Sequence, residues 1–170
     1  MNRWTRTLTA AVAALATAVI GAPPGNGQPT QVSGVAVARH VASEGRVVNV
    51  RVGEHPRFDR VVIDVRGSVP PHKVYYVHRL FNRNSGNHVP LHGRRFMVAR
   101  MYPATTANRY GRNVYKGPVL RQYSMPVLRG VALIDNFEGY VSFGIALRRH
   151  VDYRVSVLHR PKRIVIDLPR

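Results

Sequence analysis

Two segments decide the fold: VALIDNFEGYVSFGIAL at residues 131–147 and YRVSVLHRPKRIVIDL at residues 153–168. In the first segment the alternating apolar residues are Val141, Phe143, Ile145 and Leu147. In the second they are Tyr153, Val155 and Val157, followed by Ile164, Ile166 and Leu168. A period of two in β-branched and aromatic residues, interrupted by Gly and Pro, is typical of antiparallel strands with one buried face. The sequence therefore predicts consecutive half-buried strands here.

Earlier parts of the chain show the same pattern with turn signals between the runs. We expect further strands at 46–52, 58–66, 74–80, 95–102, 119–123 and 127–134, the fifth of these as a short edge strand. The alternation in the first run predicts that Val48, Val50 and Val52 share one face. No segment beyond the first 22 residues has a helical period. Eight or nine short strands favour an all-β fold, an antiparallel β-sandwich or an open barrel.

The first 45 residues differ from the rest in composition. Residues 1–22 predict a secretory signal peptide, because Arg3 and Arg6 precede an apolar stretch that ends in small residues. That stretch is shorter than the roughly 20 residues that a membrane span needs, although an uncleaved anchor stays open as an alternative. Residues 23–45 are rich in Pro, Gly, Gln and Ser and predict a flexible linker. The folded domain is then expected at 46–170, outside the cytoplasm.

The charge of the chain points to its partners. Its 170 residues contain 26 Lys and Arg against 8 Asp and Glu, a formal net charge of +18, and no Cys. Such a surface attracts polyanions. The absence of Cys excludes disulfides, thiol catalysis and lipid attachment at a lipobox cysteine. The predicted signal peptide disfavours nucleic acid as the natural ligand.

An internal similarity links two of the expected strands. RVVIDV at residues 60–65 and RIVIDL at residues 163–168 match at every position by residue class. In both, three apolar residues face one side, and Arg, Val and Asp face the other. Two independent half-buried strands explain this match better than a true repeat does, although a repeat stays open as an alternative. In either case ion pairs are expected on one sheet face, each worth only about 0–1 kcal/mol when exposed.

Three motifs, in this order, resemble the AMIN-like domain of secreted bacterial proteins and lipoproteins. They are FDRVVID at 58–64, FEGYVSFGI at 137–145 and LHRPKRIVIDL at 158–168. The resemblance spans about residues 46–168 and implies a non-catalytic envelope module, whose AMIN relatives bind peptidoglycan or related wall polymers. The residues that carry it are expected to be structural: Phe58, Asp59, Arg60, Asp64, Phe137, Glu138, Gly139, Gly144, Pro161 and Asp167. The wall-binding role comes by analogy of fold, since no amidase domain accompanies the motifs.

Catalytic and metal-binding signatures are missing from the sequence. None of the common hydrolase, nucleotide-binding or zinc-protease motifs occurs. Asp135 and Glu138 are the one carboxylate pair that an accessory hydrolase activity would use, but Glu138 is expected to pair with an Arg at a turn. His88 and His92 are separated by Pro90 and so do not share a helix face. We therefore predict no enzyme, no cofactor and no metal.

Clusters of Arg and Tyr are the candidate polymer-binding residues. They are Arg94, Arg95, Arg109, Tyr110, Arg112, Tyr115, Arg148, Arg149, Arg160 and Arg163. Guanidinium groups pair with phosphates and carboxylates, and Tyr rings stack on sugars. The prediction is binding to peptidoglycan or an anionic wall glycan. A protein partner bound at an edge strand and a merely solvated basic surface stay as alternatives.

Overall fold

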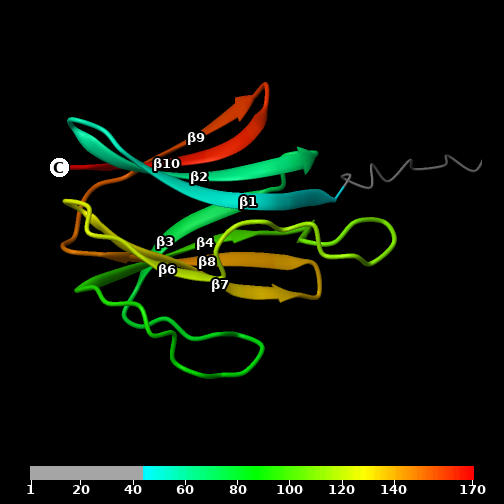
Figure 1. The fold of residues 1–170 in the computed structure, drawn as a ribbon, viewed down its shortest axis with the longest axis horizontal. Coiled ribbons are helices and arrows are strands. Elements are labelled where there is room, and N and C mark those ends of the chain that lie inside the picture. The colour runs from blue at the N-terminus through cyan, green and yellow to red at the C-terminus, as the bar shows by residue number, and fades with distance from the viewer. Residues whose placement is uncertain (1–43) are drawn as a thin grey trace, which may run out of the picture. The chain divides into compact units, whose positions relative to one another are not determined.

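The computed structural model describes residues 44–170, which form ten strands in two five-stranded sheets (Figure 1). Sheet A contains, in spatial order, β5 (Ala104–Thr105), β1 (Gly45–Glu54), β2 (Phe58–Gly67), β10 (Lys162–Pro169) and β9 (Arg154–His159). Sheet B contains β3 (His72–Val77), β4 (Arg95–Met101), β8 (Tyr140–Leu147), β7 (Leu128–Phe137) and β6 (Leu120–Gln122). The predicted signal peptide and nearly all of the predicted linker lie outside the described residues.

The two sheets face each other and are antiparallel throughout, except that β5 pairs parallel to β1. The all-β prediction is confirmed, and the arrangement is a sandwich. Within residues 44–170 there is no helix, and so none that could cross a membrane. The main core lies between the sheets, and its largest fully buried side chains include Phe143, Ile63 and Met97.

The alternation at β10 holds as predicted, whereas that at β1 does not. Ile164, Ile166 and Leu168 are buried on the inner face of β10. In β1 the buried residues are Gly45, Val47 and Val50, because a bulge shifts the register between Val47 and Asn49. The expected common face is therefore wrong for Val48, whereas Val50 and Val52 both pack on the main core. An extra residue in one strand moves every following side chain to the other face.

A second apolar cluster lies on the outer face of sheet B. It consists of Leu80, Val89, Leu91, Val98, Ala132, Ile134 and Ala146, with Val77 and Phe96 packed against it. Leu80, Val89 and Leu91 belong to the connection between β3 and β4, so residues 78–94 cover this face (Figure 1). The third strand, predicted at 74–80, therefore ends at Val77 and not at Leu80. The cover also explains why every residue of β8 from Val141 to Leu147 is buried. β8 is a central strand with both faces covered, not a half-buried one.

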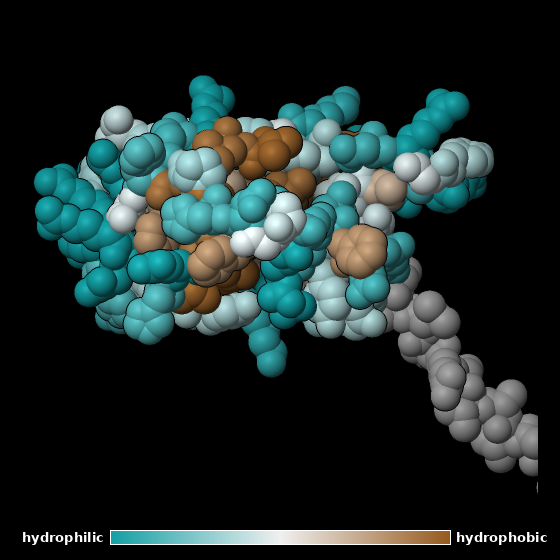
Figure 2. All heavy atoms as spheres, turned by 90° about the horizontal axis from the view of Figure 1, so that it is seen from below, coloured by the Kyte–Doolittle hydropathy of each residue, from teal (hydrophilic) through white to brown (hydrophobic). Residues whose placement is uncertain are grey.

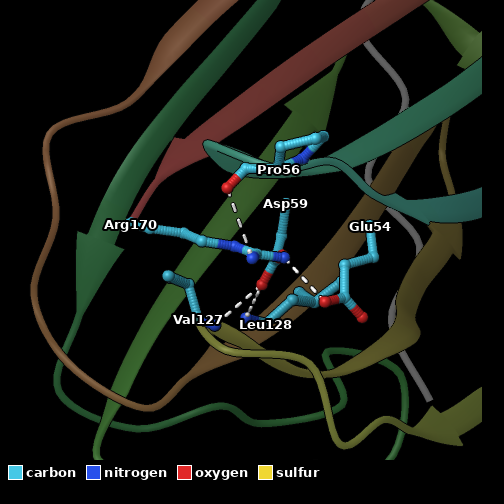
Figure 3. A network of polar contacts seen from close by, with 6 residues as sticks. All are labelled: Glu54, Pro56, Asp59, Val127, Leu128 and Arg170. Atoms are coloured by element: carbon cyan, nitrogen blue, oxygen red, sulfur yellow. Dashed lines mark hydrogen bonds and ion pairs between the residues drawn. The ribbon is translucent and has the colours of Figure 1, made fainter.

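A buried carboxylate joins the two sheets at one end of the sandwich (Figure 3). Asp59 on β2 is fully buried and accepts hydrogen bonds from the backbone amides of Val127, at 2.7 Å, and Leu128, at 2.8 Å. Arg170 lies 3.4 Å from the other Asp59 oxygen and 2.7 Å from Glu54. Because a buried charge must be paired and hydrogen-bonded, these contacts fix how the start of β7 meets sheet A.

The two similar strands, β2 and β10, are direct neighbours. Their antiparallel register pairs Arg60 with Asp167 and Asp64 with Arg163. Arg60 forms a bidentate ion pair with Asp167, at 2.6 and 2.8 Å. Asp64 instead pairs with Arg51 of β1, at 3.0 Å. The expected ion pairs on one sheet face are present, although only one of them joins the two similar strands.

Candidate functional site

Four arginines from three segments gather at the end of sheet B where β4 begins. Arg95 is the register partner of Leu147, the last residue of β8. The Arg94 amide donates to the Leu147 carbonyl at 2.8 Å, and the Arg148 amide donates to the Val127 carbonyl at 2.9 Å. The starts of β4 and β7 and the end of β8 therefore meet. We call Arg94, Arg95, Arg129 and Arg148 the basic end cluster.

Two adjoining hollows open at the basic end cluster. The larger, of about 510 Å³, is lined by His92, Gly93, Arg94, Arg129 and Arg148. The smaller, of about 300 Å³, is lined by Tyr76, Val77, His78, Arg94, Arg95 and His150. The His150 ring stacks on Tyr76 with 4.2 Å between ring centroids, and the Tyr76 hydroxyl donates to the Val151 carbonyl at 2.6 Å. Arg94 belongs to both hollows, so they form one basic surface.

No acidic residue neutralises this surface. All eight Asp and Glu of the chain lie within residues 44–170, and neither hollow is lined by one of them. In this described part of the chain the arginines that form ion pairs are Arg51, Arg60, Arg83 and Arg170. The basic end cluster contributes to none of these pairs. The Arg95 guanidinium donates to the Arg94 carbonyl at 3.3 Å, and the remaining guanidinium donors of the cluster can bind an anion.

Two of the predicted arginines lie at the opposite end of the sandwich. Arg160 lies in the turn between β9 and β10, and the Lys162 amine after it donates to the Gly67 carbonyl at the end of β2. The Asp59 contacts place the basic end cluster near the start of β2. Ten residues of strand separate these ends by about 30 Å. Arg163, beside the same turn, faces outward on sheet A.

The other predicted residues lie in the segment between β5 and β6. Arg109, Tyr110 and Arg112 are exposed, and the Arg109 guanidinium donates to the Tyr110 hydroxyl at 2.5 Å. Tyr115 is half-buried, with its ring 6.0 Å from Phe143, and its hydroxyl donates to the Pro118 carbonyl at 2.9 Å. Burial raises the pKa of the Tyr115 hydroxyl well above its usual value. Arg149 is exposed directly after Arg148 but lines neither hollow of the basic end cluster. The ten predicted residues thus occupy three separate places.

Asp135 and Glu138 do not form a joint site. Asp135 is buried on sheet B and pairs with Arg83 at 3.3 Å. Its burial raises the pKa of the carboxyl group, while the charges of Arg83 and Arg100 lower it. Glu138 is exposed at the β7–β8 turn with a φ of 48° and takes part in none of the ion pairs among residues 44–170. The structure thus contradicts the expected Glu138–Arg pair.

Several other residues of the three motifs make contacts within the domain, although Phe137 is 62% exposed. Phe58 stacks against His55 with 4.5 Å between ring centroids, and the Arg60 guanidinium carbon lies 4.9 Å from the centroid of the Phe58 ring. Gly144 faces Leu80 of the covering segment, and Gly139 adopts a φ of 77° in the β7–β8 turn. Among residues 44–170, no group of three or more His, Asp or Glu could hold a metal ion.

A tyrosine-rich cleft, which the sequence did not point to, lies on the outer face of sheet B. It is lined by Pro71, His72, Lys73, Tyr75, Arg100, Tyr102 and Tyr140. The Tyr102 and Tyr140 rings stack with 4.4 Å between centroids, and the Arg100 guanidinium lies 4.0 Å from the Tyr140 ring. These residues are distant in sequence and meet only because β3, β4 and β8 are neighbours. No sequence spacing could have revealed the cleft.

Comparison of the chain with known protein families agrees with the resemblance that the three motifs indicated. A match to the AMIN-like domain covers residues 45–170. The chain belongs to the AMIN-like domain family. This AMIN-like domain thus accounts for all ten strands, and membership is consistent with a non-catalytic envelope-targeting module. Searches of curated proteins and of solved structures find no match.

Proposed function

We propose that the protein is a secreted, non-catalytic module of the bacterial cell envelope that binds an anionic wall polymer at the basic end cluster. The observation that carries the proposal is the convergence of four arginines around two hollows without an acidic neighbour. Family membership supports an envelope location. The predicted signal peptide supports export.

The chemistry of the cluster suits phosphodiester or carboxylate groups. Guanidinium groups bind both in bidentate fashion, and such charge-assisted hydrogen bonds are about twice as strong as neutral ones. Peptidoglycan stem-peptide carboxylates and phosphodiester-linked wall glycans are therefore the ligands that we propose.

Retention of the protein on purified cell walls tests this proposal. The variant Arg94→Gln/Arg148→Gln removes two charges from the basic end cluster. Its matched control, Arg160→Gln/Arg163→Gln, removes two charges from the opposite end. We expect the first variant to lose most of its retention and the control to keep most of it. Retention should fall steeply as salt rises, because the contacts are ionic.

Equal losses in the two double variants would contradict the proposal, because they would mean attraction by net charge alone. Absence of retention even at low salt would remove polymer binding altogether. It would favour a protein partner at the edge strand β6, because an edge strand can pair with another chain and Val119 and Leu120 are exposed there.

A further inference from the structure

The tyrosine-rich cleft has the size of a binding site for a small ligand. Its volume is about 390 Å³, within the range of about 300–1,000 Å³ that is usual for ligand pockets. It lies where β3 begins, β4 ends and β8 begins, with His72 of β3 opposite Met101 of β4. The basic end cluster lies at the other ends of the same strands. The two sites are therefore separate.

The aromatic wall of the cleft is held in place before any ligand binds. The Tyr140 ring lies between Tyr102 and Arg100, at 4.4 Å and 4.0 Å. Gly139 lies directly against this wall, since a Cβ atom there would be 3.3 Å from the Tyr102 ring. Tyr102 remains 51% exposed and Tyr75 39% exposed. A flat ligand can thus stack on fixed rings at little entropic cost.

The side chains that line the cleft give it positive charge. Lys73, Arg100 and His72 line it, and no acidic residue does. The Arg100 Nε atom is buried and has no hydrogen-bond partner among the described residues. Asp135, whose charge also acts on Arg100, is paired with Arg83. The balance therefore favours an anionic group in the cleft.

The cleft continues along the sheet. A second hollow, of about 150 Å³, shares Tyr75 and Arg100 with it and extends to Phe81 and Arg83. Figure 2 shows this side of the molecule, where apolar surface alternates with hydrophilic residues. A ligand longer than one ring could therefore extend from the first hollow into the second, and both carry arginine.

We propose that the tyrosine-rich cleft binds a sugar ring that carries a carboxylate, as part of a longer glycan. The C–H groups of a pyranose face carry slight positive charge and are attracted to the negative face of an aromatic ring. The Tyr hydroxyls suit sugar hydroxyls, while Lys73 and Arg100 suit the carboxylate. The inference deepens the proposed function and rests on it for the presence of a glycan, but it uses different residues.

Titration of the full chain with two soluble tetrasaccharides tests the proposal. One is a hyaluronan tetrasaccharide, which alternates glucuronate with N-acetylglucosamine, and the other is the uncharged chitotetraose. We expect hyaluronan to bind more tightly by about tenfold, the usual contribution of a charged hydrogen bond. Amide signals of Lys73, Tyr102 and Tyr140 should shift in nuclear magnetic resonance spectra.

Substitutions assign the binding to the cleft. Tyr102→Ala and Tyr75→Ala should each weaken hyaluronan binding by about tenfold, because stacking on one ring contributes about that much. Lys73→Gln should reduce the preference for hyaluronan over chitotetraose and leave chitotetraose binding unchanged. All three side chains are on the surface, so the melting temperature should stay close to that of the unchanged protein.

Three results would overturn the proposal: no binding of either sugar, unchanged affinity in both Tyr variants, or equal binding of the two sugars. The Arg94→Gln/Arg148→Gln variant separates this test from that of the proposed function. It should bind the tetrasaccharide normally and lose only its retention on cell walls. If the Tyr variants lost cell-wall retention and the Arg94→Gln/Arg148→Gln variant did not, the result would support polymer binding at the tyrosine-rich cleft and contradict polymer binding at the basic end cluster.

Discussion

The outer face of sheet A carries charged side chains, whereas the outer face of sheet B carries, beside the tyrosine-rich cleft, an apolar cluster that residues 78–94 cover. On sheet A, Val62 and Val165 are register partners and are still buried. Arg60 and Asp167 lie beside them and form an ion pair. On sheet B, Leu80 of the β3–β4 connection packs in the outer apolar cluster and is only 1% exposed. Charged side chains with apolar stems protect one face, and a folded connection protects the other.

The difference shows that one sandwich can shield its outer apolar surface from water in two ways, which contribute differently to the free energy of unfolding. Exposed ion pairs contribute about 0–1 kcal/mol each. A buried Leu contributes about 2–5 kcal/mol when it is compared with Ala. We therefore expect the cover of sheet B to stabilise the fold far more than the ion pairs of sheet A do. Four predictions test this.

The largest effect is expected for Leu80→Ala. Loss of this buried side chain should reduce the free energy of unfolding by about 2–5 kcal/mol, since a cavity remains. Leu158→Ala on the outer face of sheet A is the matched control, because Leu158 is 39% exposed. It should change stability by less than about 0.5 kcal/mol. Chemical denaturation measures both, and similar values would mean that the two faces do not differ.

Gly144→Ala should be the next most costly change. The new Cβ atom would lie 2.9 Å from Leu80 Cδ1 and 3.1 Å from Ile134 Cγ2. Overpacking of this kind costs about 1–3 kcal/mol. The cost should shrink when Leu80→Ala is present, because the smaller side chain leaves room. Additive effects in this double-mutant cycle would show that Leu80 does not limit the space at Gly144 of β8.

Asp167→Asn should have a smaller effect on sheet A. The ion pair with Arg60 is bidentate but partly exposed, so its loss should cost no more than about 1 kcal/mol. The cost should decrease at high salt, which screens exposed charges. Denaturation at low and high salt measures it. A loss as large as that of Leu80→Ala would refute the ranking of the two faces.

The smallest effect concerns the pH dependence that Asp135 brings to sheet B. Burial raises the pKa of its carboxyl group in the folded protein, and Arg83 opposes this. A raised folded pKa means that the group's contribution to stability is complete below its unfolded pKa and is lost as the pH rises through the folded pKa. Asp135→Asn should remove this slope. Arg83→Gln should raise the pKa further, which a carbon-detected titration of the carboxyl group measures; a lower pKa would contradict it.

Local patterns predicted much of the fold. The segments 58–66 and 163–168 lie within β2 and β10, because an alternation of apolar and polar residues depends only on neighbours in the chain. The bulge at β1 could not be predicted, since the run of Val47 and Val48 fits either face. Nor could the burial of all of β8, because its cover comes from residues about fifty positions earlier.

The residues of the candidate sites were harder to predict from the sequence than the strands, because the sites depend on tertiary structure. The sequence singled out Arg94, Arg95 and Arg148, which do lie together, because they flank strands that became neighbours. It missed Arg129 in β7 and the whole tyrosine-rich cleft. It also grouped Arg160 with them, although that residue lies at the other end of β2.

The sequence by itself determined the strands, the charge of the surface and the family, because each of these is a property of residue order or composition. Only the tertiary structure decided which outer face is covered, which arginines converge and which tyrosines stack. Those outcomes depend on the pairing of strands that are far apart in the chain, and a local pattern carries no information about which strand becomes the neighbour of another.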